Sequence, residues 1–277
     1  MDDDWRIVPE SAHKRDAGHL WLGTAHEDHD ALTATFRTPA VRDGGVFAEL
    51  MEVQRQAGIV YAHRALAVPA DAVFMLTSIS LDLRPSIAGA LEHPVQGTVR
   101  VTRAAEAGAV RMARAAALRF VLEAPGARLG SGAASVKFLP IALYDRVRHG
   151  VAIAPDVRGT DETSAAILRR AARSDPARIR AREVRSNPAD PILADHTGDH
   201  LSAMAMVCEI EDAVRSDAEP RALVSLHIAF MSYAELSPVP TLVFVVAADG
   251  AIEGAVHQSG LQRAVFTGRT ARMSTHH

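Results

Sequence analysis

The chain has 277 residues, which is long enough for one large domain or two modest ones, each with a buried core. Its formal net charge of -3 is close to neutral, so we expect no nucleic-acid partner. The single cysteine, Cys208, excludes an intrachain disulfide framework and a cysteine-rich zinc module. The opening MDDDWRIVPE lacks a secretory pattern, and no apolar run approaches the roughly 18 residues of a membrane helix. We therefore expect a cytoplasmic protein without a membrane partner.

The first long element along the chain is a helix that begins at Phe47, with apolar side chains spread around its axis. A half-buried strand follows, because Ile79, Leu81 and Leu83 alternate with polar residues. Three more strand-like runs come next, separated by turns that contain glycine or proline, at 95 to 103, 110 to 122 and 127 to 139. The first half, residues 1–145, therefore has the order helix, then strands.

An Arg-rich linker, residues 146–185, separates this half from the next. It contains a short helix, because Thr160 can cap it, Asp161 and Glu162 suit the positive end of its dipole, and Pro176 stops it. Its arginines leave two alternatives open, a solvated face with internal salt pairs or a surface that attracts an acidic partner.

The second half, residues 186–277, repeats the order of the first in a shortened form. A helix over 199 to 215 precedes four strand candidates, which together indicate an internal duplication. A sheet that curls around one helix buries the apolar surface of both. We therefore expect an α+β protein in which each half is a long helix wrapped by an antiparallel sheet.

Several segments resemble the A-factor biosynthesis hotdog family, also called AfsA-like. In the first half these are HKRDAGHLWL, ELMEVQRQAGIVYAHRALAVPADAVF and ALYDRVRHG, and in the second half RSNPADPILADHTGDHLSAMAMVCEIEDAVR. The order of the motifs carries the resemblance, and its most specific part is the Glu-x-x-Arg-Gln-Ala-Gly helix. The resemblance implies a tandem double hotdog fold, whose two halves we expect to pair into one continuous sheet.

The resemblance also implies an acyltransferase of gamma-butyrolactone biosynthesis, as in actinomycete secondary metabolism. Such an enzyme moves a beta-ketoacyl group from an acyl carrier protein, or from acyl-CoA, to a hydroxyl of a small phosphorylated acceptor such as dihydroxyacetone phosphate. No cofactor is implied, and a homodimer is left open. Two alternatives remain: a hotdog thioesterase or dehydratase that acts on an acyl thioester, and a non-catalytic protein that binds an acyl chain or serves as a subunit.

In that family the helix of each repeat carries a Glu-x-x-Arg pair, and the first pair falls on Glu52 and Arg55. The second pair is lost, since Cys208 stands where the family has Glu, and Glu211 where it has Arg. The second repeat is therefore expected to be a scaffold rather than a site.

The apolar surroundings of Glu52 favour a desolvated carboxylate with a raised pKa, which suits a general base. Arg55 would anchor a phosphate or orient Glu52, and backbone N-H groups near Gly44, Gly45 and Val46 would polarise the thioester carbonyl. The alternative is an ordinary i,i+3 ion pair worth a few tenths of a kcal/mol.

Other polar residues of the motifs are candidates for substrate binding. The Asp-His pairs of DHTGDH and the histidines His26 and His29 could suggest a metal, but no long-range partner is visible, so we expect no metal site. A nucleophilic Cys208 is disfavoured because its stripe of neighbours is apolar. The candidates are Gln56, His63, His196, His200, Cys208 and Glu211.

Overall fold

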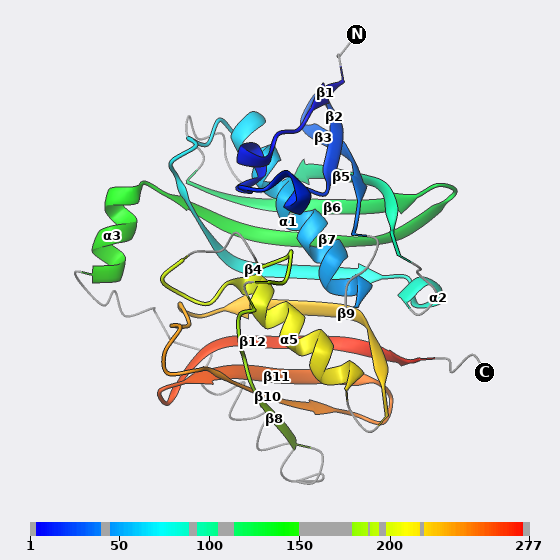
Figure 1. Ribbon diagram of the computed structural model, residues 1–277, viewed down its shortest axis with the longest axis vertical. Coiled ribbons are helices and arrows are strands. Elements are labelled where there is room, and N and C mark those ends of the chain that lie inside the picture. The colour runs from blue at the N-terminus through cyan, green and yellow to red at the C-terminus, as the bar shows by residue number, and fades with distance from the viewer. Residues whose placement is uncertain are drawn as a thin grey trace.

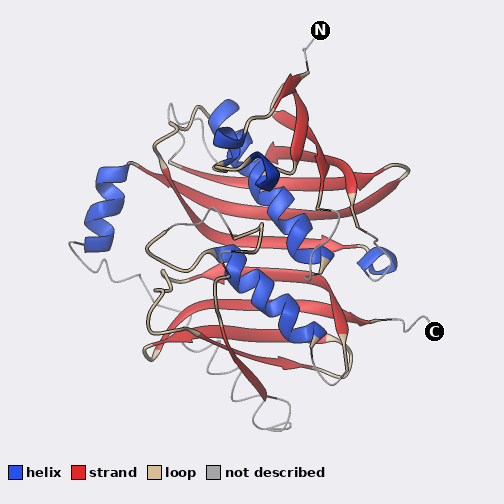
Figure 2. Ribbon diagram, in the orientation of Figure 1, coloured by secondary structure: helices blue, strands red, loops and turns tan. Residues whose placement is uncertain are grey.

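The computed structural model describes residues 4–39, 45–88, 93–104, 114–149, 179–187, 189–193, 198–216 and 219–273. In these residues one twelve-stranded sheet carries two long helices side by side on the same face (Figures 1 and 2). The strands are β1 (Trp5–Arg6), β2 (Leu22–Asp28), β3 (Ala31–Arg37), β4 (Val73–Leu83), β5 (Gln96–Arg103), β6 (Ala115–Ala124), β7 (Ala127–Leu139), β8 (Ile179–Glu183), β9 (Arg221–Phe230), β10 (Thr241–Val246), β11 (Ala251–Gln258) and β12 (Leu261–Arg272).

All the strand pairs are antiparallel, and the order across the sheet is β1-β2-β3-β5-β6-β7-β4-β9-β12-β11-β10-β8. The two halves meet where β4 pairs with β9, with Ile79 opposite Ile228 and Leu81 opposite Leu226. All four of these side chains are buried. One continuous sheet therefore runs through both halves, as predicted.

The central helix of the first half is α1 (Val46–Arg64), which is buried on almost every side. The curved sheet covers one side of it, and the 3-10 helix η1 (Pro9–Ala12) lies against another. Its ends suit the helix dipole, with Glu49 in the first turn and His63 and Arg64 in the last. A helix with apolar residues all round needs such enclosure, so the pattern around Phe47 predicted this environment correctly.

The second long helix is α5 (Ala203–Arg215), which packs against both α1 and β9. Ser202 caps its start, because the hydroxyl oxygen accepts a hydrogen bond from the Ala205 N-H at 3.1 Å. The three remaining described helices are short and peripheral: the 3-10 helix η2 (Ala17–His19), α2 (Pro85–Ala88) and α3 (Ile141–His149). Of the described helices, none is both long enough and apolar enough to cross a membrane.

Two parts of the fold differ from the sequence-based expectation. The hairpin of β2 and β3 precedes α1 and joins the sheet through β5, although no strand was predicted there. Its signal was present in β3, where Leu32, Ala34 and Phe36 are buried and alternate with more exposed residues. The second difference is β8, which falls within the predicted linker yet pairs with β10 of the second half. The linker helix predicted at Thr160 lies outside the described residues.

Candidate functional site

A buried charged cluster surrounds Glu52 on α1. The Glu52 carboxylate is fully buried and accepts two parallel hydrogen bonds from Arg55, with Nε to Oε2 at 2.7 Å and Nη2 to Oε1 at 2.8 Å. The Lys14 ammonium lies 3.1 Å from Oε1, and the Gln56 amide nitrogen donates to the same oxygen at 2.9 Å. The predicted pair is therefore formed, and it lies in the interior as the hypothesis expected, rather than on the surface as its alternative did.

Lys14 connects this cluster to the second half of the chain. It follows η1, is itself buried, and its Nζ lies 3.5 Å from the backbone oxygens of both Pro191 and Ile192. These two residues belong to the segment that leads towards α5. Sequence reasoning did not identify Lys14 as a site residue, although the chain has only two lysines and this one lies in a motif of the family resemblance.

The surroundings of Glu52 lower its pKa to about 2. Burial alone would raise the pKa, but the neighbouring Arg55, Lys14 and Gln56 favour the ionised form and prevail. The expected raised pKa is therefore wrong, because it considered burial without the cations that burial brings together. A carboxylate this acidic is a weak proton acceptor. Its evident role is to hold Arg55 and Lys14 in fixed positions.

Gln56 fixes the cluster to the backbone of the N-terminal segment. Its Nε2 also donates to the His19 carbonyl at 2.9 Å, and its Oε1 accepts from the Trp21 N-H at 3.0 Å. Both ends of the buried amide thus have partners within the protein. Gln56 positions Glu52 rather than offering a free group to a ligand.

His63 lies at the other end of α1 and pairs with His13, with 2.8 Å between their Nε2 atoms. The Nδ1 of His63 lies 2.8 Å from the Val68 carbonyl oxygen, which only accepts, so Nδ1 carries a proton and donates to that oxygen. Burial, followed by the proximity of His63 and Arg55, lowers the pKa of His13 to about 4. Near neutral pH His13 is therefore uncharged.

Glu211 has a structural position that the sequence did not predict. Its two carboxylate oxygens accept hydrogen bonds from the Phe47 and Ala48 N-H groups, each at 3.1 Å, so α5 caps the start of α1. The Phe47 and Ala48 N-H groups are consequently engaged by the protein itself. The expectation that N-H groups near Gly44, Gly45 and Val46 polarise a substrate carbonyl stays a prediction. Gly44 lies outside the described residues.

The remaining candidates lie in or before α5. Cys208 is buried within this helix, as its apolar stripe predicted. His200 precedes the helix, and its Nδ1 lies 2.8 Å from Oδ1 of Asp199. His196 lies outside the described residues. The structure therefore brings Glu52, Arg55 and Gln56 into one cluster, and places His63, His200, Cys208 and Glu211 apart from it.

Asp199 is the centre of a second polar network, which joins α3 to the second half. It accepts hydrogen bonds from Tyr144 Oη at 2.9 Å and from Arg148 Nε at 2.8 Å. Arg148 also donates two hydrogen bonds to Glu235, at 2.7 and 2.9 Å. Burial alone would raise the pKa of Asp199. The hydrogen bonds from His200, Arg148 and Tyr144 outweigh burial and lower that pKa, so the carboxylate stays ionised.

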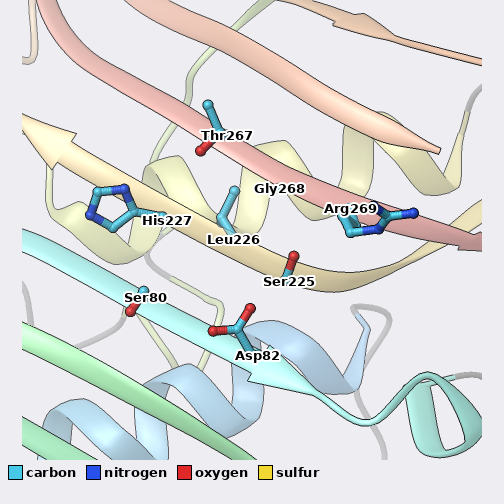
Figure 3. A pocket seen from close by; sticks show the side chains of 8 residues that line it. All are labelled: Ser80, Asp82, Ser225, Leu226, His227, Thr267, Gly268 and Arg269. Carbon is cyan, nitrogen blue, oxygen red and sulfur yellow. The ribbon is translucent and has the colours of Figure 1, made fainter. Parts of the chain in front are cut away.

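A shallow groove of about 280 Å³ lies on the opposite face of the sheet, over the seam of β4, β9 and β12. Figure 3 shows its lining on these strands, with the helices behind the sheet. The lining residues are Ser80, Asp82, Ser225, Leu226, His227, Thr267, Gly268 and Arg269. None of the predicted site residues is among them, so this groove is separate from the α1 cluster. Among the described residues, no three His, Cys, Asp or Glu side chains are grouped as metal ligands.

The sequence matches no family model and no curated protein. Solved structures do resemble it. An acyl-ACP thioesterase from Bacteroides thetaiotaomicron superposes with a TM-score of 0.56 at 11% identity, covering 88% of this chain and 98% of that one. An oleoyl thioesterase from Lactobacillus plantarum gives 0.54 at 11% identity, covering 88% and 97%. The 12:0-ACP thioesterase from Umbellularia californica gives 0.51 at 13% identity, covering 86% and 97%.

The chain has a hotdog fold. At these identities the likeness concerns the fold alone. The large antiparallel sheet with two long helices on one face is the feature that accounts for it.

Proposed function

We propose that this chain is a tandem double hotdog enzyme that acts on acyl thioesters, carried by an acyl carrier protein or by coenzyme A. Its reaction is transfer of the acyl group, in the AfsA-like form a beta-ketoacyl group, to a hydroxyl of a small phosphorylated acceptor. The observation that carries the proposal is the orientation of Arg55 by the buried, ionised Glu52. The acyl-thioesterase activity named for structures of the same fold supports the substrate class.

Arg55 is the residue of the cluster that we assign to the substrate. Its side chain is 14% exposed, whereas those of Glu52 and Lys14 are fully buried. A guanidinium held by two parallel hydrogen bonds is pre-organised, so little free energy is lost in reorienting it when negative charge develops nearby. It would stabilise either the oxyanion formed from the thioester carbonyl or the phosphate of the acceptor.

In the proposed step, the acceptor hydroxyl oxygen forms a bond to the thioester carbonyl carbon, and the carbon-sulfur bond then breaks. A base takes the hydroxyl proton, and that proton is then transferred to the sulfur of the departing thiolate. Glu52 is a positioning residue here, since its low pKa makes it unsuitable as that base.

The site is proposed to be single. At the positions of α5 that correspond to Glu52 and Arg55, the chain has the buried Cys208 and the helix-capping Glu211. The second repeat therefore supports α1 instead of forming an equivalent cluster.

Hydrolysis of the thioester is the second candidate, because the three superposed structures are named as thioesterases. Water would then take the place of the acceptor hydroxyl, with the same need for a stabilised oxyanion. Dehydration of the acyl chain and silent acyl binding are the further alternatives that the experiment separates.

The test incubates the purified chain with a beta-ketoacyl carrier protein and dihydroxyacetone phosphate, and identifies products by mass spectrometry. An acyl ester of the acceptor supports transfer, and free acid indicates hydrolysis instead. An acyl chain that has lost water indicates dehydration. Intact thioester at all enzyme concentrations overturns the enzymatic proposal.

A further inference from the structure

We infer that His200, oriented by Asp199, is the general base of this acyl-thioester reaction. The inference rests on the proposed function and supplies the proton acceptor that Glu52 cannot provide. Asp199 stays ionised, so its carboxylate only accepts, and the 2.8 Å contact places a proton on Nδ1 of His200. The Nε2 atom of a neutral imidazole then carries the lone pair that can accept a proton.

The imidazole is also accessible and held in place. The His200 side chain is 28% exposed, and its ring packs against Tyr233 with 4.6 Å between ring centroids. Among the described residues, Nε2 has no hydrogen-bond partner. A carboxylate-oriented imidazole with a free second nitrogen is the arrangement that activates hydroxyl nucleophiles and water.

Other bonds attach α3 to the second half without involving the imidazole of His200. Arg148 joins α3 to both Asp199 and Glu235, and Tyr144 adds another bond to Asp199. The groups that face His200 are Asp199 on its own segment, Tyr144 and Arg148 on α3, and Tyr233 in the loop after β9.

Asp199 and His200 lie in the segment before α5, which also contacts the Glu52 cluster. The segment before α5 contacts Lys14 at Pro191 and Ile192, and carries Asp199 and His200 just before the Ser202 cap. Since α5 packs beside α1 (Figure 2), the start of α5 and the cluster belong to the same side of the sheet.

The alternative base, His13, is less suitable. Its pKa of about 4 reflects burial together with the nearby His63 and Arg55, all of which oppose a positive charge. His200 instead contacts the Asp199 carboxylate and packs against the Tyr233 ring.

In the proposed step, Nε2 of His200 takes the proton of the attacking hydroxyl as its oxygen bonds to the thioester carbon. The tetrahedral intermediate then expels the thiolate, and the imidazolium returns the same proton to that sulfur. No oxidant, reductant or further reactant is needed.

The experiment compares the substitutions His200→Gln, His200→Ala and Asp199→Asn with the wild type, each checked for an unchanged melting temperature. His29 and Asp28 form the matched control, an Asp-His contact of 3.6 Å in the exposed β2-β3 turn, tested as His29→Gln. We expect His200→Gln to lower kcat by about 100-fold or more with little change in KM. Added imidazole should restore part of the activity of His200→Ala. ¹⁵N NMR should show the Nδ1-protonated tautomer of His200 in the wild type and its loss in Asp199→Asn.

The outcomes separate this inference from the proposed function. If His200→Gln keeps the turnover of the wild type while Arg55→Ala loses it, the inference is overturned and the proposed function stands. A wild type without any turnover overturns both. Loss of turnover in His29→Gln to the same extent as in His200→Gln also overturns the inference, since the effect would then not be specific to the oriented imidazole.

Discussion

The Lys14 ammonium lies 3.1 Å from the Glu52 carboxylate, and both side chains are withdrawn entirely from solvent. Lys14 comes from the N-terminal segment and Glu52 from the central helix, so their contact fixes the segment over α1. Removing one member of such a buried group leaves the other charges without compensation.

Glu52→Gln should therefore destabilise the protein at pH 7 by about 3 kcal/mol, because Lys14 and Arg55 lose the carboxylate between them. The pKa of Glu52 falls from an ordinary 4.5 to about 2 on folding, so its contribution is complete above pH 4.5. The contribution is lost as the pH falls from 4.5 towards 2, and the difference between variant and wild type should shrink over that range. Urea denaturation at several pH values measures this.

The control for that series is Glu27→Gln. Glu27 pairs with Arg64 at 3.0 Å, but the two side chains are 36% and 53% exposed. An exposed pair contributes under about 1 kcal/mol. Equal effects of the two substitutions at pH 7 would contradict the burial argument.

Glu211→Gln should weaken the attachment of α5 to α1. The substitution removes the negative charge at the positive end of α1 and one of the two acceptors for the Phe47 and Ala48 N-H groups. We expect a loss of about 1 to 2 kcal/mol in the free energy of unfolding. Glu209→Gln on the same helix is the control, since its partner is the part-exposed Arg182 and its expected loss is under about 1 kcal/mol. A larger loss in the control would contradict this account of Glu211.

Gly45 should be coupled to Glu211. A Cβ at Gly45 would lie 1.9 Å from Oε1 of Glu211, so Gly45→Ala must displace that carboxylate from the helix start. The substitution should destabilise the wild type by about 1 to 3 kcal/mol, and the Glu211→Ala background by clearly less. A double-mutant cycle by chemical denaturation measures the coupling. Strict additivity would show that the two residues do not interact.

His13 should make the stability depend on pH in a different range. Its pKa falls from an ordinary 6.5 to about 4 on folding, mainly through burial and then through His63 and Arg55. The unfolded chain therefore binds more protons between these values, and the free energy of unfolding should decrease as the pH falls from 6.5 to 4. His13→Gln should reduce this slope, whereas His29→Gln, with a side chain that is 94% exposed, should not. NMR titration of the His13 ring measures the pKa directly.

The sequence predicted the features that depend on local pattern. The apolar periphery of α1 indicated a wrapped helix, and the alternation at Ile79 and Leu81 indicated the strand that joins the halves. The i,i+3 spacing predicted the Glu52 and Arg55 pair. These signals lie within a few residues of each other, so single-sequence reasoning can find them.

The features that it missed depend on contacts between distant segments. The cap that Glu211 forms on α1 joins residues 164 positions apart, and no local pattern reports it. The pKa of Glu52 was predicted with the wrong sign because the prediction weighed burial alone, whereas Arg55, and then Lys14 through tertiary folding, outweigh it. Asp199 and His200 were visible as a motif, but Tyr144 and Arg148, which hold the Asp199 carboxylate, come from α3.

The most direct test of the central claim is the rate at which the chain consumes a beta-ketoacyl carrier-protein thioester, compared between Arg55→Ala and Arg64→Ala. Both arginines belong to α1, but Arg64 pairs with Glu27 near its exposed end. We predict that Arg55→Ala lowers the rate by about 100-fold or more and that Arg64→Ala leaves it within a factor of about two. Equal rates in the two variants, or no consumption by the wild type, would contradict the claim that the oriented Arg55 acts on an acyl thioester.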